Sequence, residues 1–295
     1  MVKNILYYGG CWPTNIGNSF IDIGAQKALE LAYPHAQIHF ASEFPVWFFK
    51  QEKLRSNTFS IADLIDIDMI VVSGMVCCDE FIDTEGATLL KAAARGIKIL
   101  LHGCGQLNYT TEETSRFKGF LQKLKPISFI SRDSVTHKNL SSACESSFDG
   151  IDCAFFLPNA FNQAQFSLKD YVALNFDASP EPNLNLGNNI IRTHHKCIGN
   201  LPQSWFKGHN KFISDIPDDY LNIYANCKEI HSDRVHACIA GLSFGNSVKL
   251  YSDTPRAYLF EKVGCSGVQK ELVKMDLAYL DSLKSNQIEH LKELF

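Results

Sequence analysis

The sequence lacks the features that would place the chain inside a membrane or on a nucleic-acid duplex. None of its apolar runs reaches the roughly 18 residues that a membrane-spanning helix needs. It has no basic excess, because 28 lysines and arginines stand against 32 aspartates and glutamates, a formal net charge of −4. Since duplex-binding proteins usually carry a basic excess, we expect no nucleic-acid partner. Residues 1–10 predict a first strand that runs into a Gly-Gly turn, not a signal peptide.

Disulfide and metal patterns are also missing from the sequence. The ten cysteines include no C-x-x-C pair, and several of them, such as Cys238, lie inside apolar runs. This usage is typical of buried, reduced thiols in a cytoplasmic protein. No group of residues has the spacing of a zinc site, and the offset between His231 and His236 places them on different faces of a helix. We therefore expect no metal and no cofactor.

The sequence does contain an alternation of short apolar strands and longer helical stretches. Its 295 residues, 45% of them hydrophobic, suffice for one large domain or two of middling size. Strands that alternate with helices predict βαβ units and a mostly parallel sheet. In the first half we expect strands over residues 4–8, 37–41, 69–74, 98–103 and 127–131, and helices over 18–33, 84–95 and 110–126.

A polar segment over residues 159–169, rich in asparagine and glutamine, separates the two halves of the chain. We place the domain boundary there, between an N-terminal domain of residues 1–158 and a C-terminal domain of residues 159–295. The second half predicts strands over 171–176, 229–232 and 247–251, helices over 217–227 and 233–244, and a final amphipathic helix from about Gln269. The expected fold class is α/β, with two Rossmann-like domains that face a cleft. The final helix would pack back across the first domain or against another subunit.

The loop after the strand at 229–232 carries the richest chemistry. In open α/β sheets, ligands bind outside the carboxyl ends of the strands. Here Arg234 and His236 lie in the first turn of the next helix. Arginine presents a planar fork that matches carboxylate or phosphate, and a helix N-terminus strengthens an anion site. His236 would act as a general acid or as a phosphate contact. The structural alternative is that Asp233 only caps the helix and pairs with Arg234.

Other strand ends offer weaker candidates. Arg132 follows the strand at 127–131 and would supply a second anion contact, with Asp133 or Ser134 capping the next helix. A purely structural role fits this turn equally well. The glycine turns at residues 9–18 and 102–106 let backbone approach a ligand, but each alone is also typical of a tight strand-to-helix turn. His194 and His195 receive no role.

Several motifs, taken in their order along the chain, resemble those of the polysaccharide pyruvyl transferase family. They are Asn15-x-Gly17-Asn18, Gly103-Cys104-Gly105-Gln106, Arg132-Asp133, Asp152-x-Ala154-Phe155, and Asp233-Arg234-Val235-His236 with its small-residue helix and Gly245-Asn246-Ser247-Val248. The resemblance implies a glycosyltransferase-B-like fold and phosphoenolpyruvate as the donor. It also implies a cytoplasmic sugar acceptor, lipid- or nucleotide-linked, in the assembly of a cell-surface polysaccharide such as an exopolysaccharide. A lipid-linked acceptor would bring the protein to the membrane surface without a span.

The resemblance also assigns site residues by position. It implies that the donor is bound by Arg132, Arg234, Val235, His236, Gly105 and Gln106. Arg234 and His236 would be catalytic. On the acceptor side it points to Asn15, Gly17 and Asn18.

Ketal formation from phosphoenolpyruvate needs groups that this sequence can supply. Protonation of the enol methylene gives a cation-like centre that a sugar hydroxyl attacks, so the site needs anion clamps and an acid. Arg234 and Arg132 would be the clamps and His236 the acid or phosphate contact, with no metal required. Two alternatives stay open: a nucleotide-sugar-dependent glycosyltransferase of the same fold, and a non-catalytic carbohydrate-binding homologue.

Overall fold

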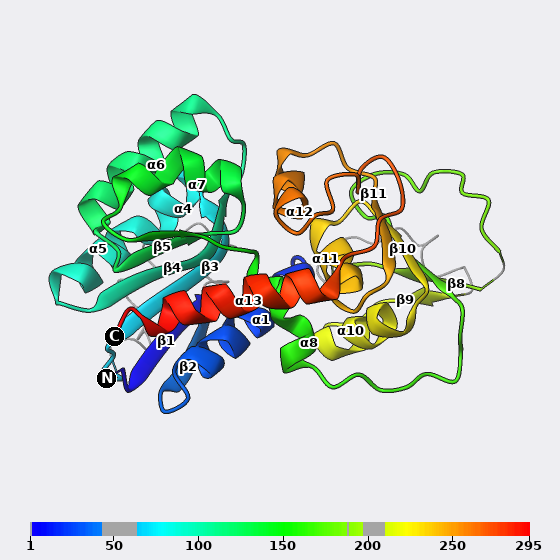
Figure 1. Ribbon diagram of the computed structural model, residues 1–295, viewed down its shortest axis with the longest axis horizontal. Coiled ribbons are helices and arrows are strands. Elements are labelled where there is room, and N and C mark those ends of the chain that lie inside the picture. The colour runs from blue at the N-terminus through cyan, green and yellow to red at the C-terminus, as the bar shows by residue number, and fades with distance from the viewer. Residues whose placement is uncertain (1, 43–63, 188, 197–209) are drawn as a thin grey trace.

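The computed structural model describes residues 2–42, 64–187, 189–196 and 210–295. Within these ranges the chain forms two parallel β-sheets, one in each half (Figure 1). The first sheet has the strand order β2-β1-β3-β4-β5-β6 and the second has the order β11-β10-β7-β8-β9. The first sheet comprises β1 (Asn4–Gly9), β2 (Gln37–Ser42), β3 (Met69–Cys77), β4 (Lys98–Gln106), β5 (Ser128–Ser131) and β6 (Ser147–Asp149). The second comprises β7 (Val172–Asn175), β8 (Ile190–Thr193), β9 (Lys211–Phe212), β10 (Glu229–Ser232) and β11 (Ser247–Leu250).

Helices connect the strands and cover the sheets. In the first half these are α1 (Gly17–Ala32), α4 (Asp79–Phe81), the π-helical turn η2 (Ile82–Gly86), α5 (Ala87–Ala94), α6 (Thr111–Leu124), α7 (Ser134–Leu140) and η3 (Ser141–Ala143). They are followed by η4 (Cys153–Phe156), α8 (Leu157–Ala160), α10 (Pro217–Asn226), α11 (Val235–Ser243), η5 (Pro255–Ala257), α12 (Tyr258–Lys262) and α13 (Leu277–Lys292). Each of the described helices is too short or too polar to cross a bilayer.

The predicted α/β architecture is confirmed, with one parallel sheet in each half of the chain. The helix expected over 84–95 begins earlier, as α4 and the π-helical turn η2 before α5. Strands β6, β8 and β9, which are two to four residues long, were not predicted. With three and two residues, β6 and β9 are too short to show a period-2 pattern.

The final helix begins later than expected. The prediction placed its start near Gln269, but α13 begins at Leu277. The preceding segment is not helical: residues 266–270 form turns, and Val273 pairs antiparallel with Val248. Asp276 then caps the helix by accepting hydrogen bonds from the amides of Ala278 and Tyr279. Tertiary pairing therefore overrides the helical pattern of residues 269–276.

Alternate residues of the strands pack into two apolar layers. Along β1, Ile5 and Tyr7 face one layer and Leu6 faces the other, as a pleated strand requires. The layer that contains Ile5 continues without a break into the second half, where it includes Ile230 of β10. A Cβ on Gly24 of α1 would overlap the carbonyl oxygen of the buried Cys153. The two domains are therefore joined by packed core, with α1 and η4 at the junction.

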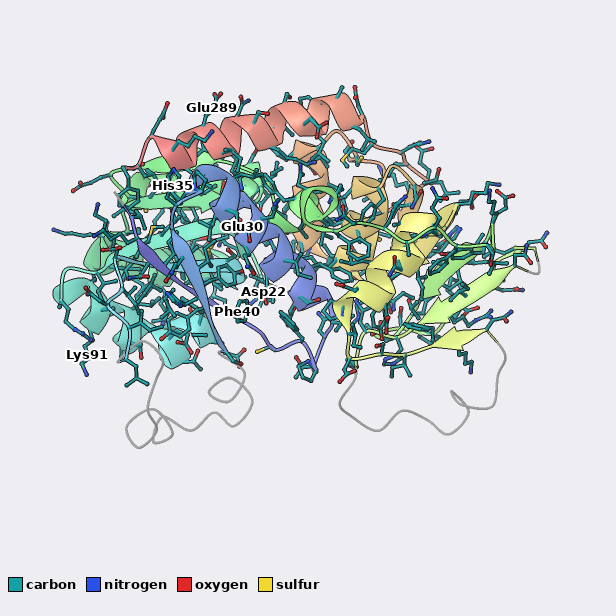
Figure 2. All side chains as sticks on the ribbon, turned by 90° about the horizontal axis from the view of Figure 1, so that it is seen from below. Asp22, Glu30, His35, Phe40, Lys91 and Glu289 are labelled. Atoms are coloured by element: carbon teal, nitrogen blue, oxygen red, sulfur yellow. The ribbon has the colours of Figure 1, made fainter. Side chains whose placement is uncertain are left out.

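Helix α13 returns from the second domain and lies along the first, beside α1 (Figures 1 and 2). The amide of Ile151 donates to Gln287 Oε1 at 2.7 Å, and Ser128 Oγ lies 2.9 Å from His290 Nε2. The Tyr33 hydroxyl donates to the carbonyl of Leu291 near the helix end. These bonds fix the second domain against the first, which places the loops between them.

Candidate active site

Two of the predicted residues, Arg132 and His236, converge between the domains on one aspartate. Arg132 follows β5, whereas His236 lies in the first turn of α11 in the second domain. Asp152, which begins η4, lies between them: its Oδ2 is 3.4 Å from Arg132 Nη1 and 3.7 Å from His236 Nε2. Arg234 immediately precedes the same helix as its N-cap residue. The carboxyl ends of β5 and β10 therefore meet at one site.

Asp152 is a fully buried charge. Burial alone would raise the pKa of its carboxyl group, but His236 and Arg132 outweigh that effect and hold the pKa below its ordinary value. The amide of Ala154 also donates to its Oδ1 at 2.9 Å. Asp152 is therefore a carboxylate at neutral pH, and it links an arginine of the first domain to a histidine of the second.

The path of the Arg132 side chain explains why residue 105 is a glycine. Arg132 is only 1% exposed, and a Cβ on Gly105 of β4 would overlap its Nε atom. In the described ranges, neither Nε nor Nη2 of Arg132 has a hydrogen-bond partner. A buried unpaired donor is costly, and the described residues supply no acceptor for either of these N–H groups. Gly105 thus acts by making room for Arg132.

Arg234 is held by a second buried carboxylate. Its Nε donates to Asp177 Oδ1 at 2.9 Å, while its Nη2 has no partner among the residues that the structure describes. Burial would raise the pKa of Asp177, but His195, Arg234 and His194 lower it overall. The Asp177 carboxylate therefore orients the guanidinium and leaves one edge free.

Asp233 does not cap helix α11, so the capping alternative is wrong. Its carboxylate instead accepts from the amides of Ala178 and Ser179 at 2.8 and 2.7 Å. Its Oδ1 lies 3.9 Å from Arg234 Nε, a longer approach than that of Asp177. No side chain of the described residues caps α11. The first amides of this helix consequently receive no acceptor from a side chain of the described residues.

The predicted acceptor residues form the loop after β1. A Cβ on Gly17 would lie 3.0 Å from His236 Cβ, so glycine lets the start of α1 pack against the start of α11. Asn15 Oδ1 accepts from the Gly17 amide at 3.1 Å, and Asn18 Nδ2 donates to the Cys11 carbonyl at 3.4 Å. The structure therefore brings Gly17 to the site, whereas the amides of Asn15 and Asn18 bond within their own loop.

The structure does not bring the Gln106 side chain to the site. Its Nε2 donates to Thr114 Oγ1 at 2.9 Å, and its Oε1 accepts from Asn139 Nδ2 at 2.8 Å. Successive residues of a strand point to opposite faces, so Gln106 points away when Gly105 faces Arg132. Val235 is buried and apolar, which leaves its backbone amide as its polar contribution to the site.

Sequence reasoning missed His195, which follows β8. Its ring is fully buried, with Nε2 2.7 Å from the Tyr224 hydroxyl. Its Nδ1 has no partner in the described part of the chain, and a Cβ on Gly17 would lie 3.3 Å from it. Burial lowers the pKa of His195 to about 3, so the ring is neutral. The short β-branched run Ile190–Thr193 was the signal that could have revealed this strand end.

Sequence reasoning also gave no role to Arg256. It follows β11 and so lies beyond the carboxyl end of a strand, where ligands of open α/β sheets bind. It lies in η5, with Nε 3.2 Å from Thr254 Oγ1 and Nη1 3.9 Å from Met75 Sδ. Burial and the nearby charges of Arg132 and Arg234 lower the pKa of Arg256. Arg256 is therefore close enough to Arg132 and Arg234 for their charges to interact.

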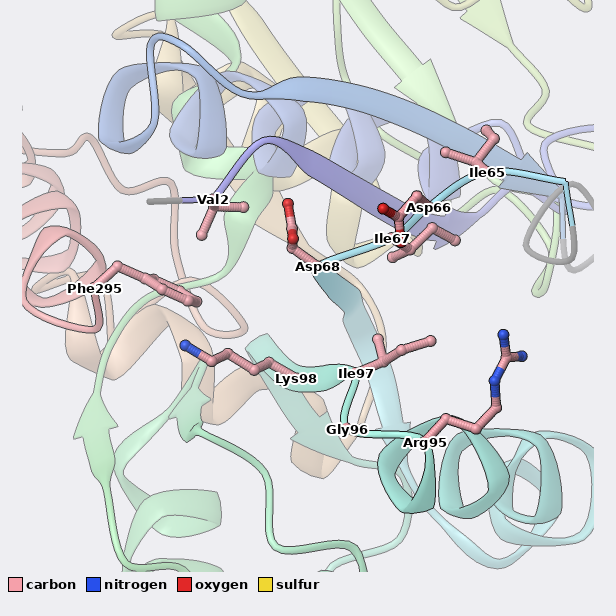
Figure 3. A pocket seen from close by; sticks show the side chains of 10 residues that line it. All are labelled: Val2, Ile65, Asp66, Ile67, Asp68, Arg95, Gly96, Ile97, Lys98 and Phe295. Atoms are coloured by element: carbon pink, nitrogen blue, oxygen red, sulfur yellow. The ribbon is translucent and has the colours of Figure 1, made fainter.

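A separate depression of about 340 Å³ lies at the opposite, amino-terminal edge of the first sheet (Figure 3). Its lining includes Val2, Asp68, Lys98 and Phe295. The Asp68 carboxylate accepts hydrogen bonds from the backbone amides of Lys3 and Asn4 at 2.7 and 2.9 Å. Because ligands of open α/β sheets bind at the other edge, this depression is not the active site. The described residues also contain no group of three histidine, cysteine or acidic side chains that could hold a metal ion.

The fold resembles that of nucleotide-sugar enzymes. A candidate UDP-N-acetylglucosamine 2-epimerase from Listeria monocytogenes superposes with a TM-score of 0.55 at 10% identity. The match covers 100% of this chain and 90% of that one. The S. aureus protein MnaA, solved with UDP, gives a TM-score of 0.56 at 12% identity, covering 99% and 91%. A Klebsiella pneumoniae protein described as uncharacterized gives 0.53 at 14% identity, covering 91% of each chain. At these identities the likeness establishes the glycosyltransferase-B-like fold alone.

Comparison at the level of sequence is more specific. The family model of the polysaccharide pyruvyl transferases matches residues 15–245, which include Arg132, Asp152, Arg234 and His236. No curated protein matches the chain.

Proposed function

The chain belongs to the polysaccharide pyruvyl transferase family, and from this premise we propose that it forms a pyruvate ketal on a sugar, with phosphoenolpyruvate as donor. The proposal extends to the acceptor, a sugar of a cell-surface polysaccharide or of its lipid- or nucleotide-linked precursor. It places the reaction in the cytoplasm. A lipid-linked acceptor would bring the protein to the membrane surface during turnover.

The observation that carries the proposal is the group formed by Arg132, Asp152 and His236, with Arg234 beside it. Phosphoenolpyruvate has a carboxylate, a phosphate and an enol double bond. Its recognition needs two anion-binding groups and an acid close together. Two arginines with unpartnered N–H groups and one histidine in the first turn of a helix supply that combination.

In the proposed reaction, His236 donates a proton to the methylene carbon of the donor. The positive charge that develops at the central carbon is met by a sugar hydroxyl, which forms a C–O bond and loses its proton. The bond from the central carbon to the phosphate oxygen then breaks, and phosphate leaves. A second sugar hydroxyl closes the ketal ring and loses its proton. A positioned acid of this kind contributes about 10²- to 10⁴-fold to the rate.

The proposed roles of the other groups follow from their surroundings. Arg132 and Arg234 bind the anionic groups of the donor through the N–H groups that have no partner in the described residues. Asp152 and Asp177 orient these two guanidinium groups. His195, being neutral, offers a hydrogen bond from Nδ1 or accepts one there, according to its tautomer.

Calorimetric titration of phosphoenolpyruvate into the purified protein tests the donor. We expect saturable binding that is lost in Arg234→Ala and retained in Arg192→Ala. Arg192 is a matched control because it is also ion-paired, to Glu181 at 2.8 Å, but lies on the other face of its strand from the buried Thr193. A fall of less than tenfold in transfer rate for Arg234→Ala would contradict the role assigned to Arg234.

A UDP-sugar titration distinguishes the alternatives. Saturable binding of UDP-N-acetylglucosamine together with no response to phosphoenolpyruvate would favour a glycosyltransferase. Binding of a sugar acceptor without release of inorganic phosphate from phosphoenolpyruvate would favour a non-catalytic homologue.

A further inference from the structure

Arg256 spans the gap between the two domains. It belongs to the second domain, where Thr254 caps η5 by accepting from the Arg256 amide at 3.3 Å. Its guanidinium group nevertheless reaches Met75 in β3 of the first domain, with Nη1 3.9 Å from Sδ. The side chain is half-buried, and its charge interacts with those of Arg132 and Arg234. Arg256 therefore contributes to the same site from a third strand end.

Contacts with the first domain hold this segment in place. The ring of Tyr258, two residues after Arg256, packs edge-on against Tyr109 with centroids 5.3 Å apart. Lys262 Nζ, at the end of α12, pairs with Asp149 Oδ2 at 2.7 Å. Because η5 and α12 are tied to the first domain at two points, the Arg256 guanidinium is positioned before any ligand binds.

The charge balance of the site singles out Arg256. Arg132 is paired with buried Asp152, and Arg234 with buried Asp177. For Arg256, by contrast, no carboxylate of residues 2–42, 64–187, 189–196 and 210–295 lies within 4.0 Å. Two of the three arginines are therefore neutralised by the protein itself. Arg256 is the one of the three without a carboxylate partner in the described ranges, and an arriving anion would relieve its repulsion from the other two.

The donor carries more negative charge than its carboxylate alone. A phosphate monoester holds about −1.5 to −2 at pH 7, with three acceptor oxygens. The planar fork of arginine matches phosphate geometry and donates two parallel hydrogen bonds. We propose that Arg256 binds the phosphate group of the donor and remains bound to it as it leaves as inorganic phosphate. This inference rests on the proposed function, in which phosphoenolpyruvate is the donor.

The test compares three probes on four proteins. Inorganic phosphate, pyruvate and phosphoenolpyruvate are each titrated into the wild type, Arg256→Gln, Arg256→Lys and the control Arg192→Gln. Pyruvate carries the carboxylate without the phosphate. We expect Arg256→Gln to weaken the binding of phosphate and phosphoenolpyruvate at least tenfold and to change that of pyruvate less than threefold. We expect Arg256→Lys to recover part of the loss and Arg192→Gln to match the wild type.

Each outcome bears on one of the two proposals. If the wild type binds phosphoenolpyruvate and Arg256→Gln binds it equally well, Arg256 is not a phosphate ligand and the proposed function stands. An equal loss for pyruvate and phosphate would also overturn the assignment to the phosphate group. If the wild type binds inorganic phosphate through Arg256 but not phosphoenolpyruvate, the phosphate site stands and the donor is wrong. Binding of neither by the wild type overturns both. Thermal unfolding of Arg256→Lys beside Arg256→Gln identifies any loss that comes from misfolding.

Discussion

His236 Nε2 lies 3.7 Å from Asp152 Oδ2, and that carboxylate also lies 3.4 Å from Arg132 Nη1. The histidine and the arginine come from different domains. A single buried charge therefore connects the proposed acid to one of the proposed anion-binding groups. Any relative movement of the domains would break this connection, so the contacts of α1, η4 and α13 that join the domains also preserve the site.

His236→Gln should separate acid catalysis from phosphate binding. If His236 is the acid, single-turnover transfer should fall about 10²- to 10⁴-fold, while the Kd of phosphoenolpyruvate changes less than tenfold. His231→Gln is the control, because His231 lies in the same domain and bonds to the Tyr251 hydroxyl at 2.9 Å, outside the group around Asp152. A large loss of donor affinity without a slower chemical step would instead make His236 a phosphate ligand.

Gly105→Ala should displace Arg132, because the added Cβ would overlap Arg132 Nε. We expect donor affinity to fall at least tenfold and the free energy of unfolding to fall by about 1–3 kcal/mol. Gly119→Ala is the matched control, since a Cβ there meets no atom within 4 Å and Gly119 lies in helix α6. That variant should gain stability, by about 0.4–1 kcal/mol. Normal donor binding by Gly105→Ala would show that the site tolerates a shifted Arg132.

Asp152→Asn should destabilise the protein, because it leaves the buried Arg132 without its counter-charge. Breaking a buried pair in this way costs about 3–5 kcal/mol, measured by urea unfolding at pH 7. Glu30→Gln is the control: its ion pair with Lys27 lies at the surface, with the glutamate 45% exposed. Such a pair is worth about 0–1 kcal/mol.

The Asp152 effect should depend on pH in a defined direction. The pKa of Asp152 is lower in the folded protein than its ordinary value of about 3.9. Its carboxylate therefore stabilises the fold above that pH, and the contribution is lost as the pH falls through the lowered pKa. The difference in unfolding free energy between wild type and Asp152→Asn should shrink below about pH 4. A difference that stays constant down to pH 2 would contradict the assigned shift.

Asp22 should show the opposite dependence. This carboxyl group lies on α1, where Figure 2 labels Asp22, and is buried. It accepts from Trp12 Nε1 at 2.6 Å and from the Gly10 amide at 2.9 Å. Burial outweighs these bonds and raises its pKa to about 6. Because the folded protein holds the proton more tightly, stability should decline as the pH rises from about 4 to about 6.

The slope of this decline is at most about 1.4 kcal/mol per pH unit. Urea unfolding of the wild type and Asp22→Asn across this interval measures it. The variant, which has no carboxyl group to titrate at this position, should lack that component of the decline. Equal slopes for the two proteins would place the folded pKa of Asp22 near its ordinary value.

Most elements of the fold could be predicted because their signals lie within a few residues. The strand β10 was predicted with its observed bounds, Glu229–Ser232, between two predicted helices. The helix expected over residues 110–126 is α6, which Thr110 caps by accepting from the Glu113 amide at 3.2 Å. The Glu113 carboxylate, however, bonds to the amides of Asn108 and Tyr109 and not to that of Thr110. Even here the reciprocal contact depended on a loop conformation that the sequence pattern does not specify.

The sequence by itself determined the α/β class, the positions of most strand ends and the arginine and histidine that open helix α11, because periodicity and helix-start signals are properties of neighbouring residues. Only the tertiary structure decided which strand ends share a site. Asp152 joins Arg132 to His236, and Arg256 reaches Met75, because α13 and the common core set one domain against the other. Such contacts join segments far apart in the chain. Their geometry depends on the packing of whole domains, which no local pattern of residues encodes.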